Sequence, residues 1–190
     1  MRVLRKIPFT LPLVLSLSLL LVAAGCAGVA SAAPVARLIA PAAVCPEVAT
    51  DAPAVEQERA MLCLTNFARR AAGLHGLALA ADLERSAVHK SADILRCDSF
   101  SHEACGRAFT YWMQRLGYLD AGCWRAGENI AWGSGRLGGV GSIFRAWMHS
   151  PGHRENILGR YAQIGIGLEV GGLDGYAGAH VWTQDFGSHC

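Results

Sequence analysis

Apolar side chains recur at helical spacing over four stretches of this chain. Within each stretch they fall three or four residues apart, as on the buried face of an amphipathic helix. Pro53 and Gly73 suit the first turn and the end of the first helix. Pro151 cannot continue the fourth helix, but Ser150 followed by Pro151 can cap and start a short new turn. The pattern predicts helices over residues 55–72, 81–96, 107–116 and 138–149.

The last part of the chain changes to an alternating pattern that predicts two strands. Apolar residues alternate with glycine or a polar residue over 164–170, and a glycine-rich turn leads into a second strand over 179–186. Gly165 and Gly167 would let another layer approach the backbone closely. The segment 129–132 can add an edge strand. Helices followed by a terminal antiparallel hairpin indicate the α+β class.

The first residues indicate export. Basic residues precede an apolar stretch over 9–25, and Ala30-Ser31-Ala32 offers small residues at the positions that a signal peptidase reads. Residues 1–32 are therefore predicted to be a secretory signal, and the stretch is short for a membrane span. The alternative is lipidation at Cys26, although Ala stands where a lipobox usually has Leu. A membrane partner is expected only in that case.

The segment after the predicted signal is rich in proline and alanine and carries little charge. Proline removes backbone donors and disfavours regular structure. We therefore expect a linker over residues 33–54 and a single domain over 55–190. The prolines of the expected linker are Pro34, Pro41, Pro46 and Pro53.

The cysteine content agrees with an exported protein. Of 7 cysteines, Cys26 leaves the thiol pool by either route of processing, and six remain. An even set predicts up to three disulfides, and the absence of a C-x-x-C pair argues against zinc-type spacing. Six cysteines allow 15 connectivities. We expect Cys97–Cys105, which would pin the loop between them, and, by elimination, Cys45–Cys63 and Cys123–Cys190.

The charge balance excludes one class of partner. The 17 Lys and Arg oppose 15 Asp and Glu, and without Arg2, Arg5 and Lys6 the basic residues number 14, a net charge of about −1. Binding to nucleic acid requires a concentrated basic face. Nucleic acid is therefore not expected, whereas a lipid, glycan or peptide ligand stays compatible with the composition.

Several ordered motifs resemble one known family. They include Phe100-Ser101-His102, Gly127-Glu128-Asn129-Ile130-Ala131, the segment from Trp147 to Leu158, and Trp182 to Gly187. The chain is similar to CAP domains, the family of cysteine-rich secretory proteins, antigen 5 and plant pathogenesis-related proteins, and most of all to their compact bacterial branch. The resemblance runs from about Glu58 to Gly187. It implies an α-β-α sandwich with a small antiparallel sheet flanked by helices.

The resemblance also implies a central cleft lined by two histidines and two glutamates that can hold a divalent metal. The first histidine and the first glutamate match His102 and Glu128, whereas the other two positions are Ser150 and Val181. His180 is adjacent to Val181, but the period of a strand directs it to the opposite face, so we expect a surface or packing histidine there.

His153 follows the start of the new helical turn and is a further candidate for the cleft. Its alternative role is to fix loops by hydrogen bonds. We therefore expect the cleft lining to comprise His102, Glu128, His153, Ser150 and Asn129, with His102 and Glu128 as candidate ligands of a metal such as zinc.

Two functions follow from these residues. The first is an exported, non-enzymatic module that binds a small lipid, glycan or peptide in the cleft. The alternative is a metal-assisted hydrolase that uses His102, Glu128 and His153. The incomplete set of ligands favours the binding module. Catalytic residues cannot be assigned from the sequence.

Overall fold

A computed structural model describes residues 34–120 and 122–189 of the 190-residue chain. The predicted signal over 1–32, with Cys26, lies outside these residues. Within the described part of the chain, no helix has the length and apolar character needed to cross a membrane.

The described chain forms five α-helices and four strands, with short 3-10 turns between some of them. The helices are α1 (Ala54–Ala71), α2 (Ala81–Arg96), α3 (Tyr111–Arg115), α4 (Val140–His149) and α5 (Pro151–Ile157). The strands are β1 (Ala78–Leu79), β2 (Trp124–Ser134), β3 (Gln163–Leu173) and β4 (Tyr176–His189). The 3-10 turns are η1 (Val35–Leu38), η2 (Ala104–Gly106) and η3 (Gly135–Gly138).

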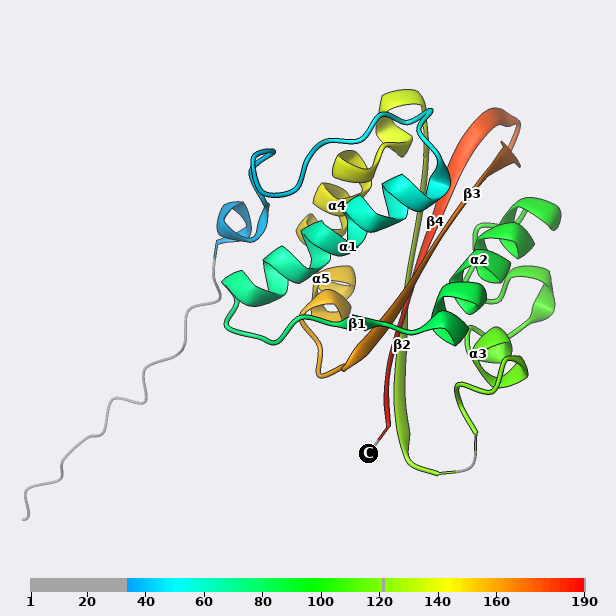
Figure 1. Cartoon of the computed structure of the whole chain (residues 1–190). Coiled ribbons are helices and arrows are strands. Elements are labelled where there is room, and N and C mark those ends of the chain that lie inside the picture. Colours follow the sequence, from blue (N-terminus) through cyan, green and yellow to red (C-terminus); the bar gives the residue numbers. More distant parts are fainter. Residues whose placement is uncertain (1–33, 121, 190) are drawn as a thin grey trace, which may run out of the picture. The chain divides into compact units, whose positions relative to one another are not determined.

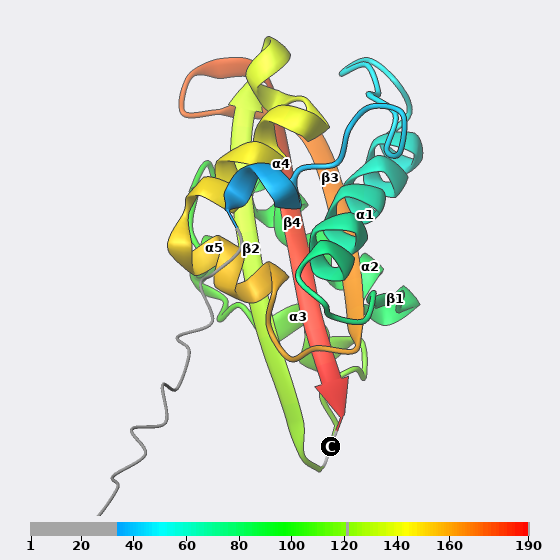
Figure 2. The ribbon, with the colours of Figure 1, turned by 90° about the vertical axis from the view of Figure 1, so that its left-hand side faces the viewer.

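The helices cover both faces of one sheet. In Figure 1, α1, α4 and α5 lie on one side of the strands, and α2 and α3 lie on the other. The view in Figure 2 shows the long strands running side by side behind α4. Helix α2 packs on β3 and β4, while α1 packs on β3 and α4. The predicted α+β class and three-layer sandwich are confirmed.

The sheet has the order β1-β3-β4-β2, so β4 lies in the interior and β2 forms an edge. Strands β2, β3 and β4 are antiparallel, as predicted. The two-residue strand β1 pairs parallel to β3, so the sheet is mixed rather than purely antiparallel. Strand β2 is much longer than the predicted edge over 129–132, because β4 offers pairing partners from Trp124 to Ser134.

Two glycines of β3 let α2 approach the sheet directly. A Cβ atom on Gly165 would lie 1.9 Å from the carbonyl carbon of Leu83, and one on Gly167 would lie 2.3 Å from the nitrogen of Val88. No side chain fits in these gaps, as the sequence pattern predicted. The close contact places the polar residues of α2 against the polar side chains of β4.

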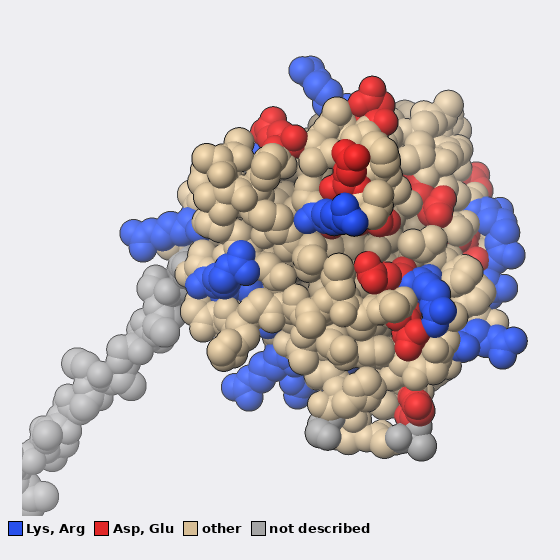
Figure 3. Space-filling model, in the orientation of Figure 1, with Lys and Arg blue, Asp and Glu red and all other residues tan. Residues whose placement is uncertain are grey.

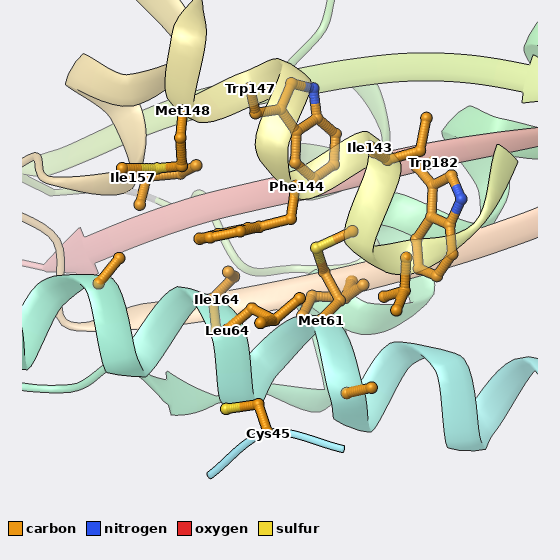
Figure 4. Close-up of a cluster of buried hydrophobic side chains, with 14 of the residues drawn as sticks. Cys45, Met61, Leu64, Ile143, Phe144, Trp147, Met148, Ile157, Ile164 and Trp182 are labelled. Atoms are coloured by element: carbon orange, nitrogen blue, oxygen red, sulfur yellow. The ribbon is translucent and has the colours of Figure 1, made fainter. Parts of the chain in front are cut away.

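The largest hydrophobic core lies on the other face of the sheet. Figure 4 shows Phe144 and Trp147 of α4 facing Met61 and Leu64 of α1, with Trp182 of β4 beside them. All five side chains are buried. This core fixes α1 and α4 on the sheet and leaves the opposite face to a more polar interior.

The segment predicted to be a linker packs against the domain. Leu38 of η1 and Cys45 are buried in the core cluster of α1 and α4. The disulfide Cys45–Cys63 joins the segment to α1. The side-chain amide of Gln57 donates to the carbonyl of Thr50 at 3.1 Å. Apolar burial and the covalent tie outweigh the effect of the prolines here, so the described part of this segment belongs to the same compact unit as the helices and the sheet.

Two local features refine the predictions. Helix α3 begins at Tyr111 rather than near residue 107, because Arg107 is extended and its guanidinium bonds to Asp93. His180 is buried, and its Nε2 atom lies 2.9 Å from the carbonyl of Thr50. It is thus a packing histidine, as expected.

Candidate functional site

The centre of the site is a hydrogen bond between the two residues that the motifs singled out. His102 Nδ1 lies 2.7 Å from Glu128 Oε1. The side chain of His102 is 53% exposed, whereas that of Glu128 is 1% exposed. An ionised carboxylate accepts from the N–H at Nδ1, which leaves Nε2 available at the surface. No residue of the described chain hydrogen-bonds to that nitrogen.

A buried lysine holds this pair from beneath. Lys90 of α2 is 2% exposed, and its Nζ lies 3.7 Å from Glu128 Oε2. The same ammonium donates a short hydrogen bond to the backbone carbonyl of His102. One cation therefore neutralises the carboxylate and also fixes the backbone of the loop that carries the imidazole.

The loop from residue 97 to 107 is braced at its base. The disulfide Cys97–Cys105 closes it, as predicted. The carboxylate of Asp93 accepts hydrogen bonds from Arg107 at 2.6 Å and from Trp112 at 2.8 Å. Burial raises the pKa of Asp93, but these donors outweigh it, so the net pKa is lowered. A covalent bond and an ionised buried anchor thus hold His102 in position.

The other disulfide predictions have different outcomes. Cys45–Cys63 is formed, which confirms the second expected pair. Cys123 is disulfide-bonded. Its expected partner Cys190 lies outside the described residues, so that pairing stays a prediction.

A second carboxylate lies behind Glu128. Asp185 is directly opposite Glu128 in the ladder between β2 and β4 and is fully buried. The hydroxyl of Ser86 lies beside this carboxylate, but neither oxygen of Asp185 accepts a hydrogen bond of good geometry from the described residues. Burial and then the charge of Glu128 raise the pKa of Asp185 well above its ordinary value. Burial likewise raises the pKa of Glu128, against the opposing effects of His102 and Lys90.

His153 lies near the exposed edge of the pair. Burial and then the neighbouring charge of His102 lower its pKa, which favours a neutral ring. Its Nδ1 atom is buried and has no partner in the described chain. The backbone carbonyl of His153 accepts a bond from Asn129 Nδ2 at 3.1 Å. His153 is therefore both close to the site and part of the packing.

Asn129 and Ser150 depart from the expected cleft lining in different ways. Asn129 is fully buried, and it bonds to Gln184 at 3.2 Å and to Asn156 at 2.9 Å. It therefore braces β2 against β4 and α5 instead of facing a ligand. Ser150 caps α5 by position, and its hydroxyl makes no hydrogen bond within the described chain.

The donor set does not match a resident metal centre. Among the described residues, no group of three or more His, Cys, Asp or Glu side chains is placed to hold a metal ion. One oxygen of Glu128 accepts from the ring of His102, the other faces the ammonium of Lys90, and the carboxylate is sealed from the surface. An open zinc site needs three protein ligands around an accessible position. Glu128 in this position could only orient a ligating histidine.

The sequence reasoning missed Lys90 and left Asp185 without a role. A signal for Lys90 existed, because it follows Ala87 by three residues and precedes Ile94 by four, which places it on the buried stripe of α2. The pairing of Asp185 with Glu128 had no such signal. It depends on the long-range register of β2 against β4.

Neither sign of charge predominates on the face of the molecule shown in Figure 3. Lys and Arg side chains alternate with Asp and Glu side chains over the face shown in Figure 3. This mixed pattern gives no basic stripe on that face.

Comparisons with known proteins agree with the fold and the motifs. The model of the CAP (cysteine-rich secretory protein) family matches residues 62–186. The uncharacterized protein YkwD of Bacillus subtilis is 32% identical over 133 residues, which cover 68% of this chain and 46% of that protein. The chain therefore spans about half the length of this relative.

Two solved structures share the fold. An extracellular protein containing an SCP domain, from Bacillus anthracis, has a TM-score of 0.58 at 25% identity over 70% of this chain and 40% of that one. An outer surface protein of Borrelia burgdorferi has a TM-score of 0.58 at 19% identity over 76% of this chain and 98% of that one. The first also exceeds this chain in length, and the second shows the fold alone.

Proposed function

Since this chain belongs to the CAP, or cysteine-rich secretory protein, family, we propose that it is an exported binding module. Its ligand is a hydroxyl- and amide-rich molecule of glycan or peptide type. The contact surface is the exposed edge of His102, with His153 beside it.

The observation that carries this proposal is that Glu128 is buried and orients the ring, whereas the side chain of His102 is half exposed and can meet a ligand. The carboxylate is sealed inside the protein, and it orients the ring through Nδ1. The side chain of His102 is half exposed, and its other ring nitrogen makes no hydrogen bond within the described chain, so it can accept one from a hydroxyl or amide of a ligand. A ligand thus meets a preorganised imidazole instead of a reactive carboxylate.

The export part of the proposal has three supports. Disulfides form and persist in oxidising compartments, and two of them close loops within the described chain. The solved neighbours include an extracellular and an outer surface protein. The predicted signal over residues 1–32 supplies the route, with lipidation at Cys26 as the alternative.

A lipid is a less suitable ligand for this chain. The apolar pocket between the segment 39–47 and α4 has a volume of about 40 Å³ and is lined by Leu64 and Phe144. That volume is too small for an acyl chain, and the larger, more open hollows of about 490 and 390 Å³ are lined by neither His102 nor His153. The side chains around His102 are polar, namely those of Glu128, Lys90 and His153.

A hydrolase is the second candidate, and the same hydrogen bond favours it. A histidine whose Nδ1 is held by a carboxylate can act as a general base toward water. However, no Ser or Cys side chain of the described residues bonds to the ring of His102. The enzyme would therefore need water as nucleophile, activated by His102 alone or by a metal.

Calorimetry tests the proposal. Three probes are titrated into the purified wild type, namely a soluble peptidoglycan fragment that carries both sugar and peptide, a lysophospholipid, and zinc. The same titrations are made with H102A and with H149A, a matched control because His149 is exposed at the end of α4 and has no hydrogen bond or ion pair with His102 or Glu128.

We expect the fragment to bind the wild type and H149A equally and H102A at least about tenfold more weakly. Intact fragment after prolonged incubation supports a binding module. Cleavage of the fragment, lost in H102A, would move the function to the hydrolase, with zinc-dependent cleavage assigning the metal-assisted form. Binding of lysophospholipid alone would refute the proposed ligand class.

A further inference from the structure

The strongest unexplained feature outside the exposed site is the carboxylate of Asp185. Its side chain is fully buried, and no N–H or O–H group of the described chain donates to either oxygen with good geometry. A buried ionised carboxylate normally accepts several hydrogen bonds or contacts a cation, because its loss of hydration is costly otherwise. Asp93 meets that condition, with donors from Arg96, Arg107 and Trp112. Asp185 does not.

The charges around Asp185 also argue against an ionised carboxylate at this position. Glu128 stands directly opposite on β2, where cross-strand Cβ atoms lie about 4.5–5.5 Å apart. The buried cation beside the two carboxylates, Lys90, forms its ion pair with Glu128 and donates to the carbonyl of His102. Two ionised carboxylates at this spacing would share one lysine and repel each other. A proton on one of the two carboxylates removes the repulsion and leaves a single negative charge for Lys90 to balance.

We propose that Asp185 is a neutral carboxylic acid in the folded protein and stores the proton that lets Glu128 stay ionised toward His102 and Lys90. Asp185 is then a positioning residue, because it acts on the exposed imidazole through Glu128. With this proton in place, Lys90 and Glu128 balance each other and the buried cluster has no net charge.

Each element packed against Asp185 supports this charge balance. Strand β2 contributes Glu128, and α2 contributes Lys90 and the neutral Ser86. Strand β3 contributes Gly165, which pairs with Asp185 and has no side chain. His102 reaches the cluster only through Glu128. No further cation is present among these described neighbours to compensate a charge on Asp185.

The pH dependence has a defined sign. An aspartate whose pKa is raised in the folded state contributes its full stability below its unfolded pKa of about 3.9. That contribution is lost as the pH rises from there toward the folded pKa. Asp93, whose pKa is lowered, has the opposite dependence. The pH dependence of the stability contributed by Asp185 can therefore be compared with that of Asp93 in the same protein.

Carbon-13 NMR of protein labelled at aspartate carboxyl carbons tests the protonation state in the unmodified chain. We expect the Asp185 signal to stay at its protonated position at neutral pH, while the Asp93 signal is at its ionised position. Backbone-linked assignment makes this measurement independent of whether any variant folds. An Asp185 signal at the ionised position at neutral pH would overturn the proposal.

Two substitutions add a functional readout. D185N should have an unchanged or raised urea midpoint at neutral pH, whereas D93N should have a lowered one. In the wild type, the nitrogen-15 signal of His102 Nδ1 should change as the pH rises through the raised pKa of Asp185, and D185N should lack this change. A urea midpoint of D185N that is lowered as far as that of D93N would contradict the proposed role of Asp185. The same pH-dependent change of the His102 signal in the wild type and in D185N would also contradict it.

Discussion

Replacement of Lys90 by methionine should expose the energetic role of the buried ion pair. Lys90 and Glu128 have side chains that are 3% and 1% exposed, with Nζ and Oε2 at 3.7 Å. At an effective dielectric constant of about 20, two unit charges at that distance attract by about 4–5 kcal/mol. Methionine conserves most of the volume, so the change removes the charge and keeps the packing.

The net cost is smaller than the attraction alone suggests, because removal of Lys90 also ends the dehydration of its ammonium. What dominates is the glutamate left buried without a cation, for which about 3–5 kcal/mol is typical. In K90M the pKa of Glu128 is raised further, so the glutamate takes up a proton as the pH falls. The loss of stability should therefore be greatest at neutral pH and shrink as the pH falls through the raised pKa of Glu128.

Urea unfolding followed by circular dichroism provides the assay, with E128Q and the double variant K90M/E128Q completing a thermodynamic cycle. We expect a coupling free energy of about 2 kcal/mol or more at neutral pH, because E128Q removes the orphaned charge. Equal costs of K90M in the wild-type and E128Q backgrounds, independent of pH, would refute the electrostatic reasoning and leave Lys90 with a packing role.

The remaining predictions concern the supports of the site. D93N should destabilise by about 2 kcal/mol at neutral pH. This difference should shrink as the pH falls through the lowered pKa of Asp93, so a pH-independent difference in urea melts would contradict the assigned ionisation. The double variant C97S/C105S should lose about 2–3 kcal/mol for a loop with a separation of 8 residues, measured by the same melts, and a loss under about 1 kcal/mol would argue against bracing. G165A should lose about 3 kcal/mol or more because its Cβ would enter the backbone of α2, while G172A, with open space around it, should stay within about 1 kcal/mol; similar midpoints for the two would contradict the close approach of helix and sheet.

The sequence was most informative where local signals and long motifs coincided. Helix α2 has the predicted bounds because Leu83, Ala87 and Ile94 recur at helical spacing along its buried face. The contact between His102 and Glu128 followed from the family motifs, and Cys97–Cys105 from the loop that it closes. Each of these features depends on residues close together in the chain or on a fixed pattern.

The predictions failed where tertiary contacts override local composition. The prolines before Pro53 indicated a linker, although the pairing of Cys45 with Cys63 implies that the segment returns to α1. Only the second interpretation is compatible with the buried Leu38. A disulfide prediction is thus also a prediction about the packing of the chain that leads to it.

The sequence also did not indicate which residues face one another across the paired strands. Asn129 and Glu128 are neighbours in one motif, but alternation along β2 directs them to different surroundings. Asn129 braces the interior, while Glu128 supports the exposed histidine. The position of Asp185 opposite Glu128 required the pairing of two residues more than 50 positions apart in the chain. A single sequence does not specify that register.

The most direct test of the binding proposal is the response of the histidine rings to a ligand. Nitrogen-15 NMR of the folded wild type is recorded while a soluble peptidoglycan fragment is added. The account predicts that the ring signals of His102 and His153 shift in a saturable way, while those of the exposed His89 and His149 stay unchanged. Saturable binding that leaves His102 unperturbed would contradict the proposed site.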